Sequence, residues 1–101
     1  MTRSYLHLRS RPERREELIR ALDRLEVLTA ARRQPGFLAG EIQLAPADAD
    51  RLLLWSSWAS PEHHERWLAS PAYARMLAET EDLRDGEPDV RVYRVVDAVQ
   101  A

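Results

Sequence analysis

The residues best suited to chemistry gather in SSWASPEHHERWLASPAY, residues 56–73, which holds two adjacent histidines and two of the three tryptophans. Imidazoles can bind a metal ion or accept a proton near neutral pH. Neighbouring helical residues point about 100° apart, so His63 and His64 cannot chelate one ion from one face. Glu62 and Glu65 do not complete the metalloprotease spacing either. We therefore expect no metal site and interpret both histidines as solvated residues of a first helical turn.

Aromatic side chains of the same region could instead clamp a flat ring by stacking. On a helix interrupted near residue 70, Trp67, Tyr73 and Met76 could turn toward one space. Trp58 or Trp55, from the segment before the helix, could line the other side of that space. The alternative is that these large side chains simply fill the core, as aromatic residues often do.

Two further candidates lie outside this region. His7, in SYLHLRS, would be a proton acceptor for the same cavity if its side of a strand faced the helices. Otherwise it is a half-exposed strand histidine at an edge or at a dimer rim. Glu41 is either an acid that faces a barrel interior or a partner for an arginine.

Composition excludes several classes of protein. With 101 residues, the chain is expected to form a single domain over residues 1–101. Its net charge of -2 and pI of about 5.9 argue against a partner nucleic acid, which needs a surplus of cations. Without cysteine or lysine there is no thiolate nucleophile and no Schiff base. No signal core or membrane-length apolar run is visible, so a cytoplasmic protein without membrane contact is expected.

Periodicity and turn residues predict the elements that must position these side chains. Residues 4–10 alternate as a strand, and residues 11–36 predict one long amphipathic helix that ends at Gln34-Pro35-Gly36. Residues 37–59 predict a hairpin with its turn at APADAD, residues 45–50. Residues 60–84 predict a helix broken at Ser70-Pro71, where each Ser-Pro step caps a new start. Residues 90–97 form the last strand.

This order of strand, helix, strand, strand, helix and strand is the α+β, ferredoxin-like βαββαβ arrangement, with a four-stranded antiparallel sheet. Its two helical segments can cover only one face of that sheet. The third strand nevertheless carries consecutive apolar residues from Leu52 to Trp55. Both of its faces therefore need cover, and we expect a homodimer packed sheet to sheet.

The chain resembles the antibiotic biosynthesis monooxygenase family of small dimeric α+β barrel proteins over nearly its whole length. The resemblance lies in QPGFLAGEIQL, LLLWSSWAS and SPEHHERWLASPAYARML. The chain departs from the family pattern at Ser56 and Ser57, where many members carry an acid–base pair. Trp67 is similar to the haem-degrading branch, but the chain has no asparagine and lacks the later helix histidine of that branch. Haem degradation in the style of that branch is therefore not expected, and haem handling is kept as a third alternative function.

The resemblance implies a monooxygenase that needs no cofactor and oxidises a polycyclic or quinol-type aromatic molecule with O₂. No glycine-rich loop or ligand cluster points to a flavin, a nicotinamide or a metal. The residues expected to act in catalysis are His7 as base, Trp67 as ring platform and Tyr73 as hydrogen-bond donor, and those expected to bind substrate are Trp58, Trp55, Glu41 and Met76. The alternative is a non-catalytic dimeric protein that binds a hydrophobic small molecule or serves in stress responses, which Ser56 and Ser57 favour slightly.

Overall fold

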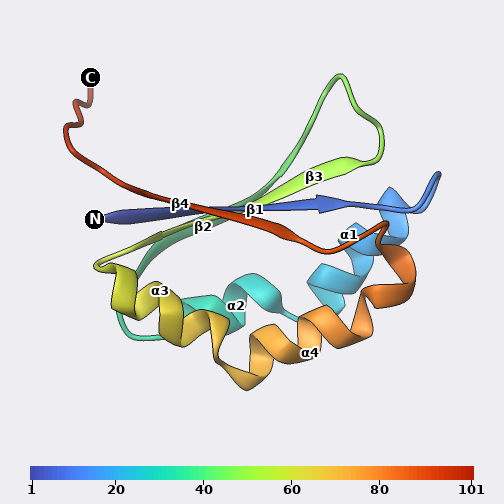
Figure 1. Cartoon of the computed structure of the whole chain (residues 1–101), viewed down its shortest axis with the longest axis horizontal. Helices are drawn as coiled ribbons and strands as arrows, with labels where there is room; N and C mark the ends of the chain where they lie inside the picture. The colour runs from blue at the N-terminus through green and yellow to red at the C-terminus, as the bar shows by residue number, and fades with distance from the viewer.

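The computed structural model describes residues 1–101. The chain forms, in order, β1 (Thr2–Arg9), α1 (Arg15–Arg24), α2 (Val27–Arg32), β2 (Phe37–Leu44), β3 (Arg51–Trp58), α3 (Pro61–Leu68), α4 (Pro71–Glu79), the 3₁₀ turn η1 (Glu81–Leu83) and β4 (Asp89–Arg94). The strands make one antiparallel sheet in the order β2-β3-β1-β4. The helices all lie on one side of it (Figure 1). The predicted ferredoxin-like fold is confirmed.

The expected single helix over residues 11–36 is wrong, because the chain breaks it into α1 and α2 at Glu26. Glu26 has a left-handed backbone with φ of 53°, and Pro12 lies in a turn before α1. At about 100° per residue, a continuous helix would point Val27 half a turn away from Leu18. The break instead directs Val27 into the core beside Leu22, and all three side chains are buried.

The predicted break between α3 and α4 is confirmed, and each helix has its own cap. The Ser60 hydroxyl accepts a hydrogen bond from the His63 N–H at 3.3 Å, and the Ser70 hydroxyl accepts one from the Tyr73 N–H at 3.2 Å. Serine at the cap with proline next satisfies amide groups that would otherwise be unpaired. Trp67 and Tyr73 therefore sit on two separately capped helices.

The sheet has one covered and one uncovered face. On β1 and β3, Leu6, Leu8, Leu52 and Leu54 are buried against the helices. The residues that alternate with them point to the other side, which we call the open face: Arg3, Tyr5, His7, Glu41, Leu53, Trp55, Asp89, Arg91 and Tyr93. The molecule measures 38 × 31 × 21 Å, and its shortest dimension is the thickness of two layers, the sheet and the helices.

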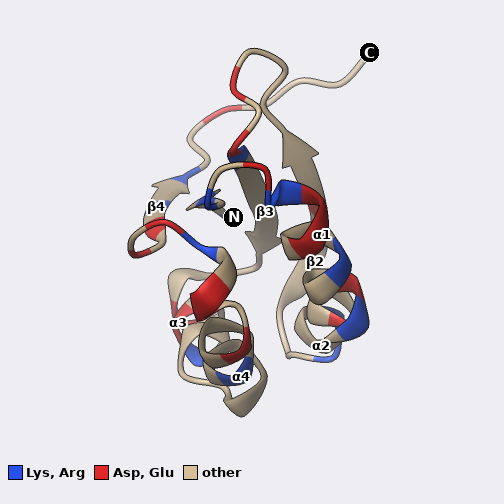
Figure 2. Ribbon diagram, turned by 90° about the vertical axis from the view of Figure 1, so that its right-hand side faces the viewer, with Lys and Arg blue, Asp and Glu red and all other residues tan.

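Acidic and basic residues are interspersed along the ribbons of the helices and form no long basic run (Figure 2). No helix of the chain has both the length and the apolarity that crossing a membrane requires.

Candidate functional site

A cluster of aromatic rings lies between the covered face of the sheet and the second helical layer. We call it the aromatic cluster: Phe37, Trp58, His64, Trp67 and Tyr73. The Trp58 and Trp67 rings stack at 6.3 Å and 23°, and Tyr73 meets Trp67 edge-on at 5.7 Å. Phe37 meets the other side of Trp58 at 5.4 Å. The structure therefore brings together three of the predicted site residues, and Met76 lies in the same core.

The expected cavity between the two indoles is not formed. Trp58 is 0% exposed and Trp67 is 3% exposed, and neither lines any of the five main hollows of the chain. The indoles occupy the space themselves, because α3 places Trp67 flat against Trp58. This packing corresponds to the alternative in which the large side chains fill the core.

Ser56 has a clear role in this packing. Its hydroxyl accepts a hydrogen bond from Nε1 of Trp58 at 2.9 Å. A buried indole N–H needs such a partner, since leaving it unpaired would cost about 1–3 kcal/mol. Ser56 thus acts as the hydrogen-bond acceptor for Trp58 and does not form part of an acid–base pair. Ser57 points to the opposite side of the strand.

The expectation that both histidines are solvated is wrong for His64. His64 is 2% exposed, and its ring centroid lies 6.0 Å from that of Trp58. Burial lowers the pKa of His64 below that of an ordinary histidine, and the negative charge of Glu65 partly opposes this shift. His63 instead packs over Gly36, where a Cβ atom would clash with the imidazole. The aromatic cluster therefore contains a buried imidazole whose pKa is lowered by its burial.

A buried cation, not singled out from the sequence, lies near Tyr73. Arg84 is 6% exposed and donates hydrogen bonds only to neutral oxygens, those of Thr80, Gly86 and Leu77, at 2.9–3.1 Å. Burial raises the pKa of Tyr73, and the charge of Arg84 partly opposes that rise. Each nitrogen of the Arg84 guanidinium group therefore donates to a neutral oxygen, and no carboxylate pairs with the charge.

The other three predicted site residues lie on the open face, away from the aromatic cluster. His7 alternates with the buried Leu6 and Leu8 and pairs with Leu53 across the ladder. Glu41 and Trp55 face each other in the β2–β3 ladder. Within one chain, therefore, His7 does not share a cavity with Trp67, because successive residues of a strand point to opposite faces.

Sequence comparison decides the family. A sequence model described as antibiotic biosynthesis monooxygenase matches residues 1–79. The chain belongs to this family. No curated protein matches the chain.

Solved structures agree with the family fold. A structure from Deinococcus radiodurans that is named for the same family has a TM-score of 0.85 at 18% identity, with 100% of this chain and 98% of that chain covered. Rv0793 from Mycobacterium tuberculosis has a TM-score of 0.83 at 22% identity, with 98% of each chain covered. A third structure, from Nitrosomonas europaea, has a TM-score of 0.83 at 14% identity over 96% of this chain and 100% of that chain. At these identities the likeness shows the fold alone.

The largest of the five main hollows in this antibiotic biosynthesis monooxygenase family member lies between α1, α2 and β2. Its volume is about 550 Å³, within the range of small-molecule pockets. Apolar side chains and a charged or polar rim line it: Ile19, Leu22, Val27, Leu28 and Ile42 with Arg20, Asp23, Glu26 and Thr29. No histidine borders it, so it offers a binding surface without an evident neutral proton acceptor.

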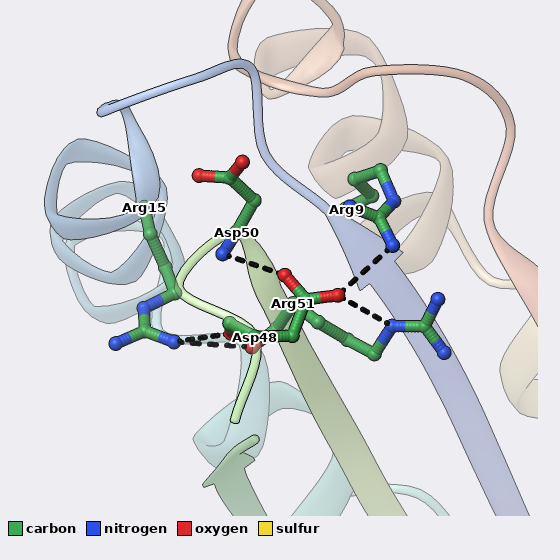
Figure 3. Close-up of polar contacts among 5 residues, drawn as sticks. All are labelled: Arg9, Arg15, Asp48, Asp50 and Arg51. Carbon is green, nitrogen blue, oxygen red and sulfur yellow. Dashed lines mark hydrogen bonds and ion pairs between the residues drawn. The ribbon is translucent and has the colours of Figure 1, made fainter. Parts of the chain in front are cut away.

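A second polar cluster holds the β2–β3 turn (Figure 3). Oδ2 of Asp48 pairs with Arg9 at 3.0 Å and with Arg51 at 3.5 Å. Arg15 donates to the carbonyl oxygen of Asp48 at 3.0 Å. A hydrogen bond from the Asp50 N–H, helped by the arginines, holds the pKa of Asp48 below its usual value. These contacts hold the turn against β1 and α1.

The chain contains no group of three acidic or histidine side chains placed to hold a metal ion.

Proposed function

We propose that the chain is a monooxygenase that binds a flat aromatic substrate at the aromatic cluster and oxidises it with O₂. The observation that carries the proposal is the stack of the Trp58 and Trp67 indoles with Tyr73 edge-on to Trp67, together with the buried cation of Arg84, which has no carboxylate partner and whose charge acts on Tyr73. A buried charge without a partner is costly in an apolar interior, and such groups concentrate at functional sites. Family membership supports the same reaction type.

The substrate itself supplies the electrons. A phenol or anthrone-type CH₂ group gives a proton to His64, whose lowered pKa keeps the imidazole neutral near pH 7. The hydroxyl of Tyr73 and the charge of Arg84 stabilise the resulting anion. The anion passes one electron to O₂, and the two radicals combine to a peroxide. The carbon that bonds to oxygen, the CH₂ carbon of an anthrone or the para C–H carbon of a phenol, keeps one oxygen as a quinone carbonyl. The other oxygen leaves as water with the proton lost first and the remaining hydrogen of that carbon.

Access to the cluster requires movement, because the indoles are enclosed. The break at Ser70-Pro71 separates Trp67 on α3 from Tyr73 on α4, and each helix keeps its own cap. A swing of α4 at this break moves Tyr73 off Trp67 without unwinding either helix. A substrate ring then takes the place that Tyr73 leaves, with one face on the Trp67 indole.

The test compares O₂ consumption by wild type, Tyr73→Phe and Tyr93→Phe with an anthrone and with a naphthol. Tyr73→Phe removes one buried hydroxyl and should lower kcat about 10- to 100-fold. Tyr93→Phe makes the same change on the open face, where the residue is exposed, and should leave kcat unchanged. Trp67→Phe should raise KM more than it lowers kcat.

Absence of protein-dependent O₂ uptake with both substrates would contradict the monooxygenase. Equal rates for Tyr73→Phe and wild type would contradict the assignment of the site.

The second candidate function is binding of a hydrophobic small molecule without turnover. The closed aromatic cluster and the hollow of about 550 Å³ between α1, α2 and β2 favour it. In that case Leu28→Trp, which fills the hollow, should abolish binding of a fluorescent aromatic probe, while Trp67→Phe should leave it unchanged. The monooxygenase at the aromatic cluster predicts the opposite pattern.

We also propose that the chain works as a homodimer joined through the open face. Tyr5, Leu53 and Trp55 are only half buried there, and Arg3 lies over the Trp55 ring with its Nε atom buried and unpaired. Covering this apolar surface is favourable because it removes the surface from water. A second copy of the chain, related by two-fold symmetry, can provide the cover.

A further inference from the structure

A hollow lies at the seam between two groups of helices, where α2 meets α4. Figure 2 shows α1 and α2 as one group and α3 and α4 as the other, on the same side of the sheet. We call it the seam hollow, and it is lined by Leu25, Glu26, Ala30, Arg33, Ala72 and Arg75. Its volume is about 170 Å³. A pocket for a whole small molecule has about 300–1,000 Å³, so the seam hollow can receive one end of a ligand.

The seam hollow adjoins the core that contains the aromatic cluster. All its lining residues belong to helices or their caps and none to the sheet, so it opens on the side away from the sheet. Ala30 and Ala72 are half-buried and pack against the core that includes Trp67 and Tyr73. Ala72 precedes Tyr73 in the first turn of α4, next to the break between α3 and α4. A swing of α4 at this break therefore moves one wall of the hollow together with Tyr73.

The rim of the seam hollow carries two cations, Arg33 and Arg75, and one acid, Glu26. Arg33 and Glu26 form no ion pair, either with each other or with another residue. Arg75 pairs with Glu79 at 3.1 Å in an exposed contact. Such a pair contributes little to stability, so Arg75 can turn to another anion at small cost. Because a guanidinium group binds a carboxylate through two parallel hydrogen bonds, the rim is suited to a carboxylate.

We propose that the seam hollow is the entrance to the aromatic cluster and that it selects polycyclic aromatic molecules that bear a carboxylate. Arg33 and Arg75 hold the carboxylate at the rim, and the ring system passes beside Ala72 to the Trp67 indole, into the place that Tyr73 leaves. The charged end of the substrate stays in contact with water, which avoids the cost of burying it. This inference rests on the monooxygenase proposed above and adds the class of its substrate.

Calorimetric titration with a matched pair of ligands that do not turn over tests this entrance. Anthraquinone-2-carboxylate and anthraquinone-2-carboxamide have nearly the same shape, and only the first is charged near neutral pH. Wild type should bind the acid about tenfold more tightly than the amide. Arg33→Gln should reduce this preference about 3- to 10-fold and leave the affinity for the amide unchanged. Salt at about 0.5 M should weaken binding of the acid alone, because it screens charges at an exposed rim.

Two controls separate the charge from the position of the hollow. Arg32→Gln makes the same change on the neighbouring exposed residue, which does not line the hollow, and should keep the preference of the wild type. Ala72→Phe fills the hollow and should weaken binding of both ligands. Ala74→Phe adds the same ring at an exposed position of the same helix and should leave both affinities unchanged.

Three results would overturn the entrance: no binding of the acid by wild type, equal affinity for acid and amide, or a preference for the acid that survives in both Arg33→Gln and Arg75→Gln. Surface cations that only solvate the helices predict the last two. The monooxygenase would still stand if an anthrone drove protein-dependent O₂ uptake. Absence of O₂ uptake together with a preference that depends on Arg33 would contradict the monooxygenase and keep the carboxylate site.

Discussion

At the residue scale, burial decides what each imidazole of this chain can do. His7, His63 and His64 could not be ranked from the sequence, because nothing in it tells which imidazole is buried. Which of two neighbouring helical residues is buried depends on the orientation of the helix about its own axis relative to the sheet. Here α3 is oriented so that His64 and Trp67 both face Trp58. That orientation is set by Trp58 and Ser56, which come from another element.

We expect His64 to make the fold sensitive to acid. Its folded-state pKa lies below 6.5, so on acidification the unfolded chain takes up a proton before the folded chain does. Its contribution to stability is therefore fully present above pH 6.5 and is lost as pH falls toward the folded-state pKa. Urea unfolding from about pH 8 to 5 should show a smaller loss of stability for His64→Gln than for wild type.

The matched control is His63→Gln, which makes the same change on the neighbouring residue that packs over Gly36. It should lose stability with falling pH as wild type does. If His64→Gln and wild type lost stability equally, the imidazole of His64 would not be held neutral in the folded chain.

At the element scale, the sequence predicts breaks that have a local chemical signal and misses those that do not. Ser60-Pro61 and Ser70-Pro71 carry a cap and a proline, so both helix starts were predicted correctly. The α1–α2 break at Glu26 has neither a side-chain cap nor a glycine. The core imposes it, because the break is what turns Val27 and Ala31 inward.

Replacing Glu26 by glycine should therefore stabilise the chain. A left-handed non-glycine residue costs about 1–2 kcal/mol, while glycine loses about 0.5–1 kcal/mol more entropy on folding. The expected net gain in the free energy of unfolding is about 0.5–1 kcal/mol, measured by urea unfolding. Arg20→Gly, in the middle of α1, should instead lose about 1 kcal/mol. A destabilised Glu26→Gly would show that the carboxylate, not the backbone, fixes the break.

At the scale of the whole molecule, the sequence predicted that both faces of the sheet carry apolar residues. It did not predict which residues lie on which face. Leu52 to Trp55 correctly indicated a strand with apolar residues on both sides. Which of them face the helices depends on register, and a shift of one residue exchanges every side chain between faces. The ladder sets Leu54 opposite Leu6 and Leu53 opposite His7. The four predicted site residues on strands were divided between the two faces for the same reason: His7, Glu41 and Trp55 lie on the open face and Trp58 on the covered face.

The two adjacent leucines now give opposite predictions for one substitution. Leu54 is 5% exposed in the core between sheet and helices, so Leu54→Glu buries an unpaired carboxylate at a cost of several kcal/mol and should unfold the chain. Leu53→Glu places the same charge on the open face, where water solvates it in a single chain but a second copy would bury it. For Leu53→Glu we expect a folded monomer of 11.7 kDa by light scattering, with the circular dichroism of the wild type.

Val92→Glu, at an exposed position on the other side of β4, controls for added charge and should leave the dimer intact. A Leu53→Glu protein that remains as dimeric as wild type would place the contact between copies elsewhere than the open face.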